Sequence, residues 1–261
     1  MWTQTKSIFP ARSLHPIQTT LMILWVLTMI SMPIINWTYG WDFMINMVNI
    51  SVIVQVSAVI AVLWKAWGTT KTLRITALVF ILGWAAEAIG SRTGYPFGSY
   101  DYTKALQPQL FHVPLLIPLA WMMMLPPAWG VGQAISRRLN PRWQLIGFVG
   151  FSALAMTAWD LFLDPQMVSW GLWEWYIPGG YFGIPWSNYL GWLFVSAIIT
   201  IFIYPRQLPV APLLLIYTIT WLLQTVGLGV FWNIPGPAIV GGIIMGSLTI
   251  LSWRAYFKNS L

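Results

Sequence analysis

The sequence contains no cysteine and only two histidines among its 261 residues. Disulfides and thiolate chemistry are therefore excluded, and a transition-metal site built from imidazole and thiolate ligands is not expected. Charged residues are also scarce, at 7% of the chain against about 25% in an ordinary soluble domain. A water-soluble fold of this size cannot cover its surface with so few charges. The chain is therefore expected to use lipid as its solvent.

Apolar residues dominate instead, at 58% of the chain, and 19 of the residues are tryptophan. Apolar runs of about 20 residues, long enough to cross a bilayer as a helix, recur between polar, proline or glycine breaks. They predict an all-α polytopic membrane protein with a single transmembrane domain over residues 1–261 and about eight transmembrane helices. The predicted spans are 17–36, 43–64, 72–90, 112–135, 143–163, 187–204, 211–230 and 235–253.

The basic residues sort to one side of this topology. With the N-terminus inside, eleven of the thirteen Lys and Arg residues fall in cytoplasmic segments, and only Arg92 and Lys104 fall outside. This positive-inside pattern predicts a multi-pass protein of the cell (inner) membrane with both termini in the cytoplasm. Because topology accounts for the formal charge of +7, nucleic acid is not an expected partner.

The acidic residues all fall on the opposite side of the predicted bundle. Carboxylates are costly at membrane depth, so those at helix ends that face the protein interior are candidates for function. The six acids are Asp42, Glu87, Asp101, Asp160, Asp164 and Glu174.

Asp160 and Asp164 are four residues apart at the end of the fifth span, which places both carboxyl groups on one face of a helix. Pro165 is expected to end that helix. Two close carboxyl groups in an apolar setting cannot both ionise cheaply, so one is expected to keep its proton. A protonated acid beside an ionised one is the arrangement that acid–base chemistry needs.

Other polar residues are placed to complete such a site. Glu87 lies in the last turn of the third span and is expected to face the same cavity. Asn188, at the start of the sixth span, is expected to orient a carboxylate or a water molecule. The alternative is that the acids are structural, capping backbone amides or pairing with Arg92 as their charge partner. His112 opens the fourth span, where a lone imidazole is more often a structural hydrogen-bonding group than a base.

Two long loops on the acidic side are rich in glycine, proline and aromatic residues, a composition that specifies turns. They cover residues 90–110 and 160–188. Loops this apolar are expected to fold back as a lid over the mouth of the bundle, because aromatic residues favour the membrane interface. Trp173, Trp175 and Tyr176 are expected to line a groove for a long apolar ligand. The alternative is an interfacial aromatic belt, which is the favoured interpretation for Trp170.

Several segments between about residues 80 and 195 carry motifs with a family resemblance. They are Glu87–Gly90, Thr93–Tyr100 with Tyr102, Val113–Trp121, Trp159–Pro165, Trp173–Trp175, Tyr181–Pro185, and Asn188 with Gly191 and Trp192. At these segments the chain resembles the membrane carotenoid-biosynthesis family, which includes the carotenoid 1,2-hydratases of the γ-carotene and bacterioruberin pathways.

The resemblance implies that water adds across the terminal C1–C2 double bond of a linear carotenoid end group. Protonation of the less substituted carbon leaves a tertiary carbocation, which water captures to give a tertiary alcohol, with no cofactor and no metal. A carboxylic acid kept neutral by an apolar site supplies the proton. Asp160 or Asp164 is then the expected acid, and its partner or Glu87 the expected base.

The expected ligand is a carotenoid or another long isoprenoid, held within the lipid bilayer. Association with other carotenoid enzymes or with a pigment–protein complex is also open. Aromatic side chains that line the site can stabilise the developing cation. The expected substrate-binding residues are Tyr100, Tyr102, His112, Trp121, Trp173, Trp175, Tyr176 and Asn188.

Three alternatives to hydration remain open. The chain could be a non-catalytic carotenoid-binding subunit of a larger assembly. It could be a carotene end-group cyclase, in which an internal alkene captures the cation in place of water. A membrane prenyltransferase would use Asp160 and Asp164 to hold magnesium on a diphosphate, but only Arg92 and Lys104 lie on the acidic side to bind that anion.

Overall fold

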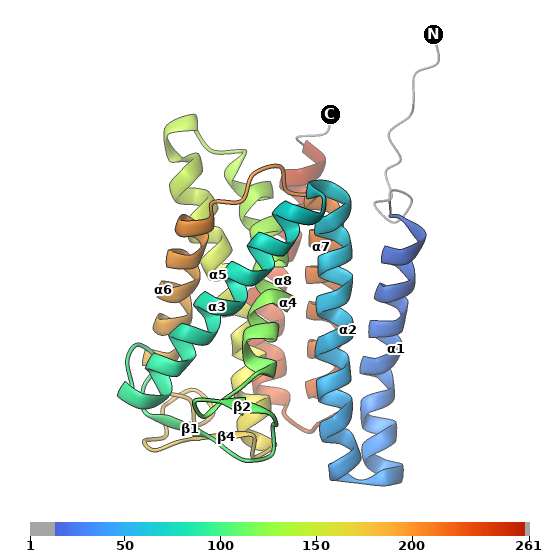
Figure 1. Cartoon of the computed structure of the whole chain (residues 1–261), viewed down its shortest axis with the longest axis vertical. Helices are drawn as coiled ribbons and strands as arrows, with labels where there is room; N and C mark the ends of the chain where they lie inside the picture. Colours follow the sequence, from blue (N-terminus) through green and yellow to red (C-terminus); the bar gives the residue numbers. More distant parts are fainter. Residues whose placement is uncertain (1–13, 259–261) are drawn as a thin grey trace.

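Each predicted span overlaps one α-helix of the computed structural model, which describes residues 14–258 (Figure 1). The helices are α1 (Pro16–Tyr39), α2 (Trp41–Trp67), α3 (Thr69–Thr93), α4 (Leu116–Ser136), α5 (Gln144–Ser169), α6 (Trp186–Ile203), α7 (Val210–Val226) and α8 (Pro235–Lys258). A 3-10 turn, η2 (Pro141–Trp143), precedes α5, and a π-helical segment, η3 (Gly227–Phe231), follows α7. The all-α prediction is confirmed.

Short strands are confined to one end of the bundle, at the lower left in Figure 1. They are β1 (Tyr100–Tyr102), β2 (Gln109–Leu110), β3 (Val113–Pro114) and β4 (Trp173–Trp175). Antiparallel pairing joins β1 to β4 and β2 to β3. The first of these pairs brings together the two loops that the sequence predicts to cover the bundle.

Within residues 14–258, seven helices are long and apolar enough to cross a membrane, and α4 is the helix that falls short. The chain is accordingly a multi-pass membrane protein. Helix α4 carries Pro126 and Pro127 in its interior and is buried along most of its length. It packs against α2, α3, α5, α7 and α8, so its side chains contact other helices and not lipid.

Single glycines with positive φ set the sharp turns between the first helices. Gly40 (φ 84°) separates α1 from α2, and Gly68 (φ 74°) separates α2 from α3. A side chain is strained at such φ values, whereas glycine adopts them freely. These turns need no long loops, so α1 and α2 run antiparallel side by side in Figure 1, and α3 starts at the upper end of α2 and slants away from it.

The two ends of the bundle differ in charge. The end at which α2, α4, α6 and α8 finish carries basic residues, namely Lys65, Lys71, Arg74, Arg137, Arg138, Arg142, Arg206, Arg254 and Lys258. Lys6 and Arg12, which the sequence assigns to the same side, lie outside the described residues. Asp42 begins α2 at the opposite end, where the carboxylates of α3, α5 and the strands also lie. The charge separation expected from the sequence is therefore present in the fold.

The contact between α4 and α5 depends on a glycine, and replacing it should destabilise the bundle. A Cβ atom at position 132 would overlap Ser152 Oγ and come within 2.6 Å of the Phe148 carbonyl oxygen. Overpacking of this kind costs about 1–3 kcal/mol. We expect Gly132→Ala to lower the midpoint of thermal unfolding in detergent, whereas Gly150→Ala, with no neighbour within 4 Å of the added atom, leaves it unchanged or raises it. Equal midpoints for the two variants would contradict this packing.

Candidate active site

Three carboxyl groups are buried together near the strand end of the bundle. Glu87 comes from the last part of α3, and Asp160 and Asp164 come from successive turns of α5. Their exposed fractions are 3%, 0% and 3%. Buried carboxyl groups are costly unless they are hydrogen-bonded or neutralised, so the contacts of each group decide what this cluster can do.

Glu87 accepts three hydrogen bonds. Tyr100 Oη and Tyr102 Oη donate to its Oε2 at 2.6 and 2.8 Å, and Trp121 Nε1 donates to its Oε1 at 3.0 Å. Burial raises the pKa of the Tyr100 hydroxyl well above its usual range, and the adjacent Glu87 charge raises it further. Tyr100 therefore stays a hydroxyl donor at neutral pH. Both tyrosines lie on β1, so the lid itself supplies two of the donors to Glu87.

Asp160 and Asp164 lie side by side, because one amide nitrogen, Asn188 Nδ2, contacts both carboxyl groups. Two adjacent buried carboxyl groups cannot both ionise cheaply. Asn188 Nδ2 on α6 donates to Asp160 Oδ2 at 2.9 Å and also contacts Asp164 Oδ2. Trp173 Nε1 on β4 donates to Asp164 Oδ1 at 3.1 Å. The contact of Asn188 with a carboxylate, expected from the sequence, is thus present with both aspartates.

The helix that carries the aspartates does not end at Pro165, and that prediction is wrong. Helix α5 continues through Pro165 to Ser169. Because proline has no N–H group, it leaves the carbonyl four residues earlier without its helical partner. That carbonyl belongs to Leu161, and Tyr181 Oη donates to it at 3.1 Å. The second loop thereby satisfies the group that the proline leaves free.

The pairing of β1 with β4 gives the lid an aromatic inner face. Tyr100 lies opposite Trp175 and Tyr102 opposite Trp173, and these four side chains are buried or half-buried. Side chains alternate along a strand, so the middle pair, Asp101 opposite Glu174, points outward and is exposed. The lid therefore presents aromatic rings to the carboxylates and charge to its outer side.

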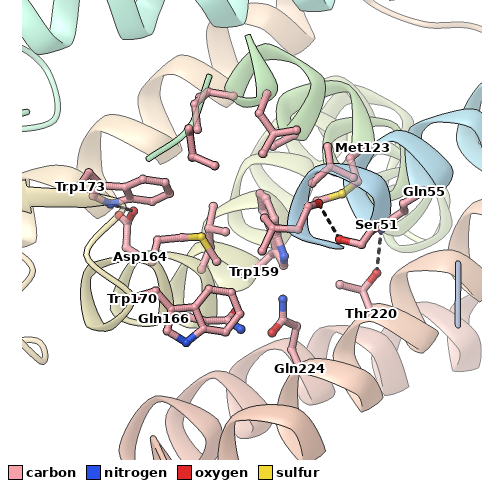
Figure 2. Close-up of a pocket in the computed structure, with 18 of the residues that line it drawn as sticks. Ser51, Gln55, Met123, Trp159, Asp164, Gln166, Trp170, Trp173, Thr220 and Gln224 are labelled. Carbon is pink, nitrogen blue, oxygen red and sulfur yellow. Dashed lines mark hydrogen bonds between the residues drawn. The ribbon is translucent and has the colours of Figure 1, made fainter. Parts of the chain in front are cut away.

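A cavity of about 90 Å³, counted as the space open to the centres of water-sized molecules, lies beneath this lid. Glu87, Asp164 and Asn188 line it, whereas Asp160 lies behind Asp164 and is not part of the lining. Figure 2 shows Asp164 and Trp173 on one side of the cavity and a set of polar side chains opposite them. That polar set consists of Ser51, Gln55, Thr220 and Gln224, and Gln166 lines the cavity beside Trp170.

Four of the substrate-binding residues predicted from the sequence line the cavity besides Asn188. They are Tyr100, Tyr102, Trp173 and Trp175. Trp121 is buried and contacts Glu87, but it is not part of the lining; its ring stacks on that of Trp192 at 4.4 Å between centroids. Trp170, which the sequence assigns to an interfacial belt, also lines the cavity.

Three predicted site residues lie away from the carboxylates. His112 and Phe111 form the exposed turn between β2 and β3, both with positive φ, because this turn and not the helix follows Leu110. Tyr176 is exposed and its hydroxyl donates to Asp101 on the outer side of the lid. Arg92 is exposed and lies 5.0 Å from the Phe111 ring centre, so it stacks on an aromatic ring in place of pairing with the buried acids.

Several residues that line the cavity beneath the lid were not among the site residues predicted from the sequence. Trp159 and Trp192 line the cavity and contact each other edge to face. Gln55, Gln166 and Gln224 line it as well. Glutamines inside apolar spans are themselves a signal, because polar groups at membrane depth usually face the protein interior.

The chain is thus a polytopic membrane protein in which three carboxyl groups are buried beneath an aromatic lid. The chain matches the family described as "Carotenoid biosynthesis protein" over residues 47–248, and it belongs to that family. It is similar to a bisanhydrobacterioruberin hydratase from Haloarcula japonica, with 30% identity over 129 residues that cover 48% of this chain and 42% of that protein. The similarity thus spans less than half of that relative's length. No solved structure matches the chain.

Proposed function

We propose that this protein is a carotenoid 1,2-hydratase, which adds water across the terminal C1–C2 double bond of a linear carotenoid. Family membership and the name of the hydratase relative support a carotenoid-modifying role. The observation that carries the proposal is the adjacent pair of buried aspartates, both contacted by Asn188, beside a cavity that Asp164 and Glu87 line. Among the described residues, the lining of this cavity includes no Lys, Arg or His.

Asp164 is the proposed acid, because it lines the cavity and lies beside Asp160, with which it is proposed to share one proton. The proton passes from the Asp164 carboxyl group to C2 of the end group, and the electron pair of the double bond forms the new C–H bond. A tertiary cation remains at C1. Asp160 does not reach the cavity, so it acts through Asp164, and we assign it as a positioning residue that holds the shared proton.

Glu87 is the proposed base. Three donors face its two oxygens, which suits an ionised carboxylate. The oxygen of a water molecule bonds to C1 as one proton of that water passes to Glu87, and the product is a tertiary alcohol. Return of the proton from Glu87 to the aspartate pair completes the cycle, so that the sum is the addition of one water.

The remaining lining suits the intermediate and the second substrate. The rings of Trp159, Trp173 and Trp192 line the cavity and can stabilise the cation at C1. The carboxylates of the same lining balance its charge. Gln166 is buried, and its Oε1 has no hydrogen-bond partner. This oxygen is free to accept a hydrogen bond from a water molecule in the cavity.

Co-expression with a lycopene-producing pathway in a bacterium tests the proposal. We expect a pigment heavier by one water, with the hydroxyl group at C1 by fragmentation in the mass spectrometer. A product of unchanged mass with a cyclised end group would instead assign a cyclase. Unaltered lycopene that co-purifies with the protein, with γ-carotene also left unaltered, would assign a binding subunit and overturn hydration.

A further inference from the structure

A second cavity adjoins the one beneath the lid. It has about 290 Å³ of space by the same measure and is lined by residues of α1, α7 and η3. Met29, Met32, Gln166 and Gln224 line both cavities. The two spaces therefore meet at these four side chains, and together they lead from Asp164 to the gap between α1 and α7.

The outer part of the second cavity reaches the apolar surface of the bundle. Ile30 and Trp37 on α1 are 52% and 66% exposed, and Val226 at the end of α7 is 50% exposed. Among the described residues that line this cavity, none is charged. Both helices are long and apolar enough to span a membrane, so the surface around this opening is one that lipid tails cover.

The opposite end of the path is closed. Tyr100, Trp173 and Trp175 of the lid are 3%, 5% and 9% exposed above the carboxylates. The cavity beside Asp164 has room for an end group but not for a long polyene. An end group that reaches Asp164 must therefore leave the rest of its chain in the adjoining cavity and beyond it.

The backbone beside the opening is irregular. The π-helical segment η3 follows α7 directly and includes Gly227, which lines the second cavity. Such segments occur mostly as single turns within helices and often at functional sites. Phe231 of η3 and Trp37 of α1 both line the second cavity, with their ring centroids 6.1 Å apart, so η3 borders the gap beside α1.

We propose that the gap between α1 and α7–η3 is a lateral portal, through which a linear isoprenoid enters from the bilayer and in which its chain remains during the reaction. The identity of the ligand rests on the proposed function. The portal residues are Ile30, Pro33, Trp37, Leu223, Val226 and Phe231. The four side chains that line both cavities determine how far the end group advances towards Asp164.

The absence of cysteine from the natural sequence allows a reversible block of this portal. Val226→Cys places a thiol in the portal, and Leu222→Cys places one on the exposed face of the same helix, outside the lining of either cavity. Each purified variant is treated with a bulky aromatic methanethiosulfonate and then with a reductant. Binding of lycopene in detergent is measured by its absorbance at every stage, and hydration is measured in parallel.

We expect modification at position 226 to abolish lycopene binding and reduction to restore it, with no change for the variant at position 222. Full binding by the modified Val226→Cys protein, or no binding by the unmodified wild-type chain, would overturn the portal. The two proposals fail separately. Loss of binding on modification without hydration by any variant refutes the hydratase alone, and hydration that the modification leaves intact refutes the portal alone.

Discussion

Replacing Asp164 by Asn is expected to lower hydration of a linear carotenoid by about 10²- to 10⁴-fold, the usual contribution of a positioned general acid. The amide keeps the shape of the side chain but cannot deliver a proton to the alkene. The measurement is the rate of product formation by purified protein, with lycopene binding recorded in parallel. Binding should persist, because the aromatic lining and the second cavity are unchanged.

Glu174→Gln is the matched control for this variant. Glu174 is a carboxylate of the same end of the bundle, but it lies exposed on the outer side of the lid. Its replacement removes one negative charge without touching the cavity, and hydration should stay close to that of the wild type. Full activity of Asp164→Asn would remove Asp164 from the role of acid. A loss in both variants would indicate an effect of net charge and not of the site.

Replacing Glu87 by Gln is expected to reduce hydration by about the same 10²- to 10⁴-fold range, through loss of the general base. A glutamine retains one oxygen that can accept from Trp121, so the side chain can stay in place. Tyr102→Phe is the control, because it removes one of the three donors to Glu87 and keeps the carboxylate. It should retain far more activity than Glu87→Gln.

Running the reaction in deuterium oxide distinguishes the role of Asp164 as acid from the role of Glu87 as base. With Glu87→Gln, Asp164 still adds a deuteron to C2, and the cation can lose a proton back to the Asp164 carboxylate. Recovered carotenoid should then carry deuterium without added water. Asp164→Asn should give neither deuterium exchange nor hydration. Exchange that is equally fast in Asp164→Asn, or absent from Glu87→Gln, would contradict the assignment of acid and base.

Much of the fold was predictable because each helix is set by local sequence. Apolar runs of membrane length and their breaks placed eight helices within a few residues of the observed ends. The predicted end of α5 at Pro165 is wrong because the carbonyl that this proline leaves free has another hydrogen-bond partner. The partner here is Tyr181, which is 20 residues from Leu161 in the sequence, and no local pattern announces that contact.

Several residues of the site could be predicted from the sequence, but the way in which they are arranged could not. A spacing of four residues placed Asp160 and Asp164 on one helix face, and membrane depth singled out Glu87. The pairing of β1 with β4 joins residues more than 70 positions apart, and this pairing decides that Tyr100 and Trp173 face inward while Tyr176 faces out. His112 was misplaced because the turn after β2 takes the residues that the hydropathy pattern assigned to the helix.

The burial of α4 has a consequence for how the protein is made. Among the helices of residues 14–258, α4 is the one that is not apolar enough to span a membrane by itself, and α5, α7 and α8 cover much of it. All three are synthesised after it. In a nascent chain that ends at Ser136, α2 and α3 are already present, but the three later helices that cover α4 have not yet been made. The order of synthesis makes α4 depend on the second half of the chain for its place in the bilayer, and the carboxylate site can assemble only after that step.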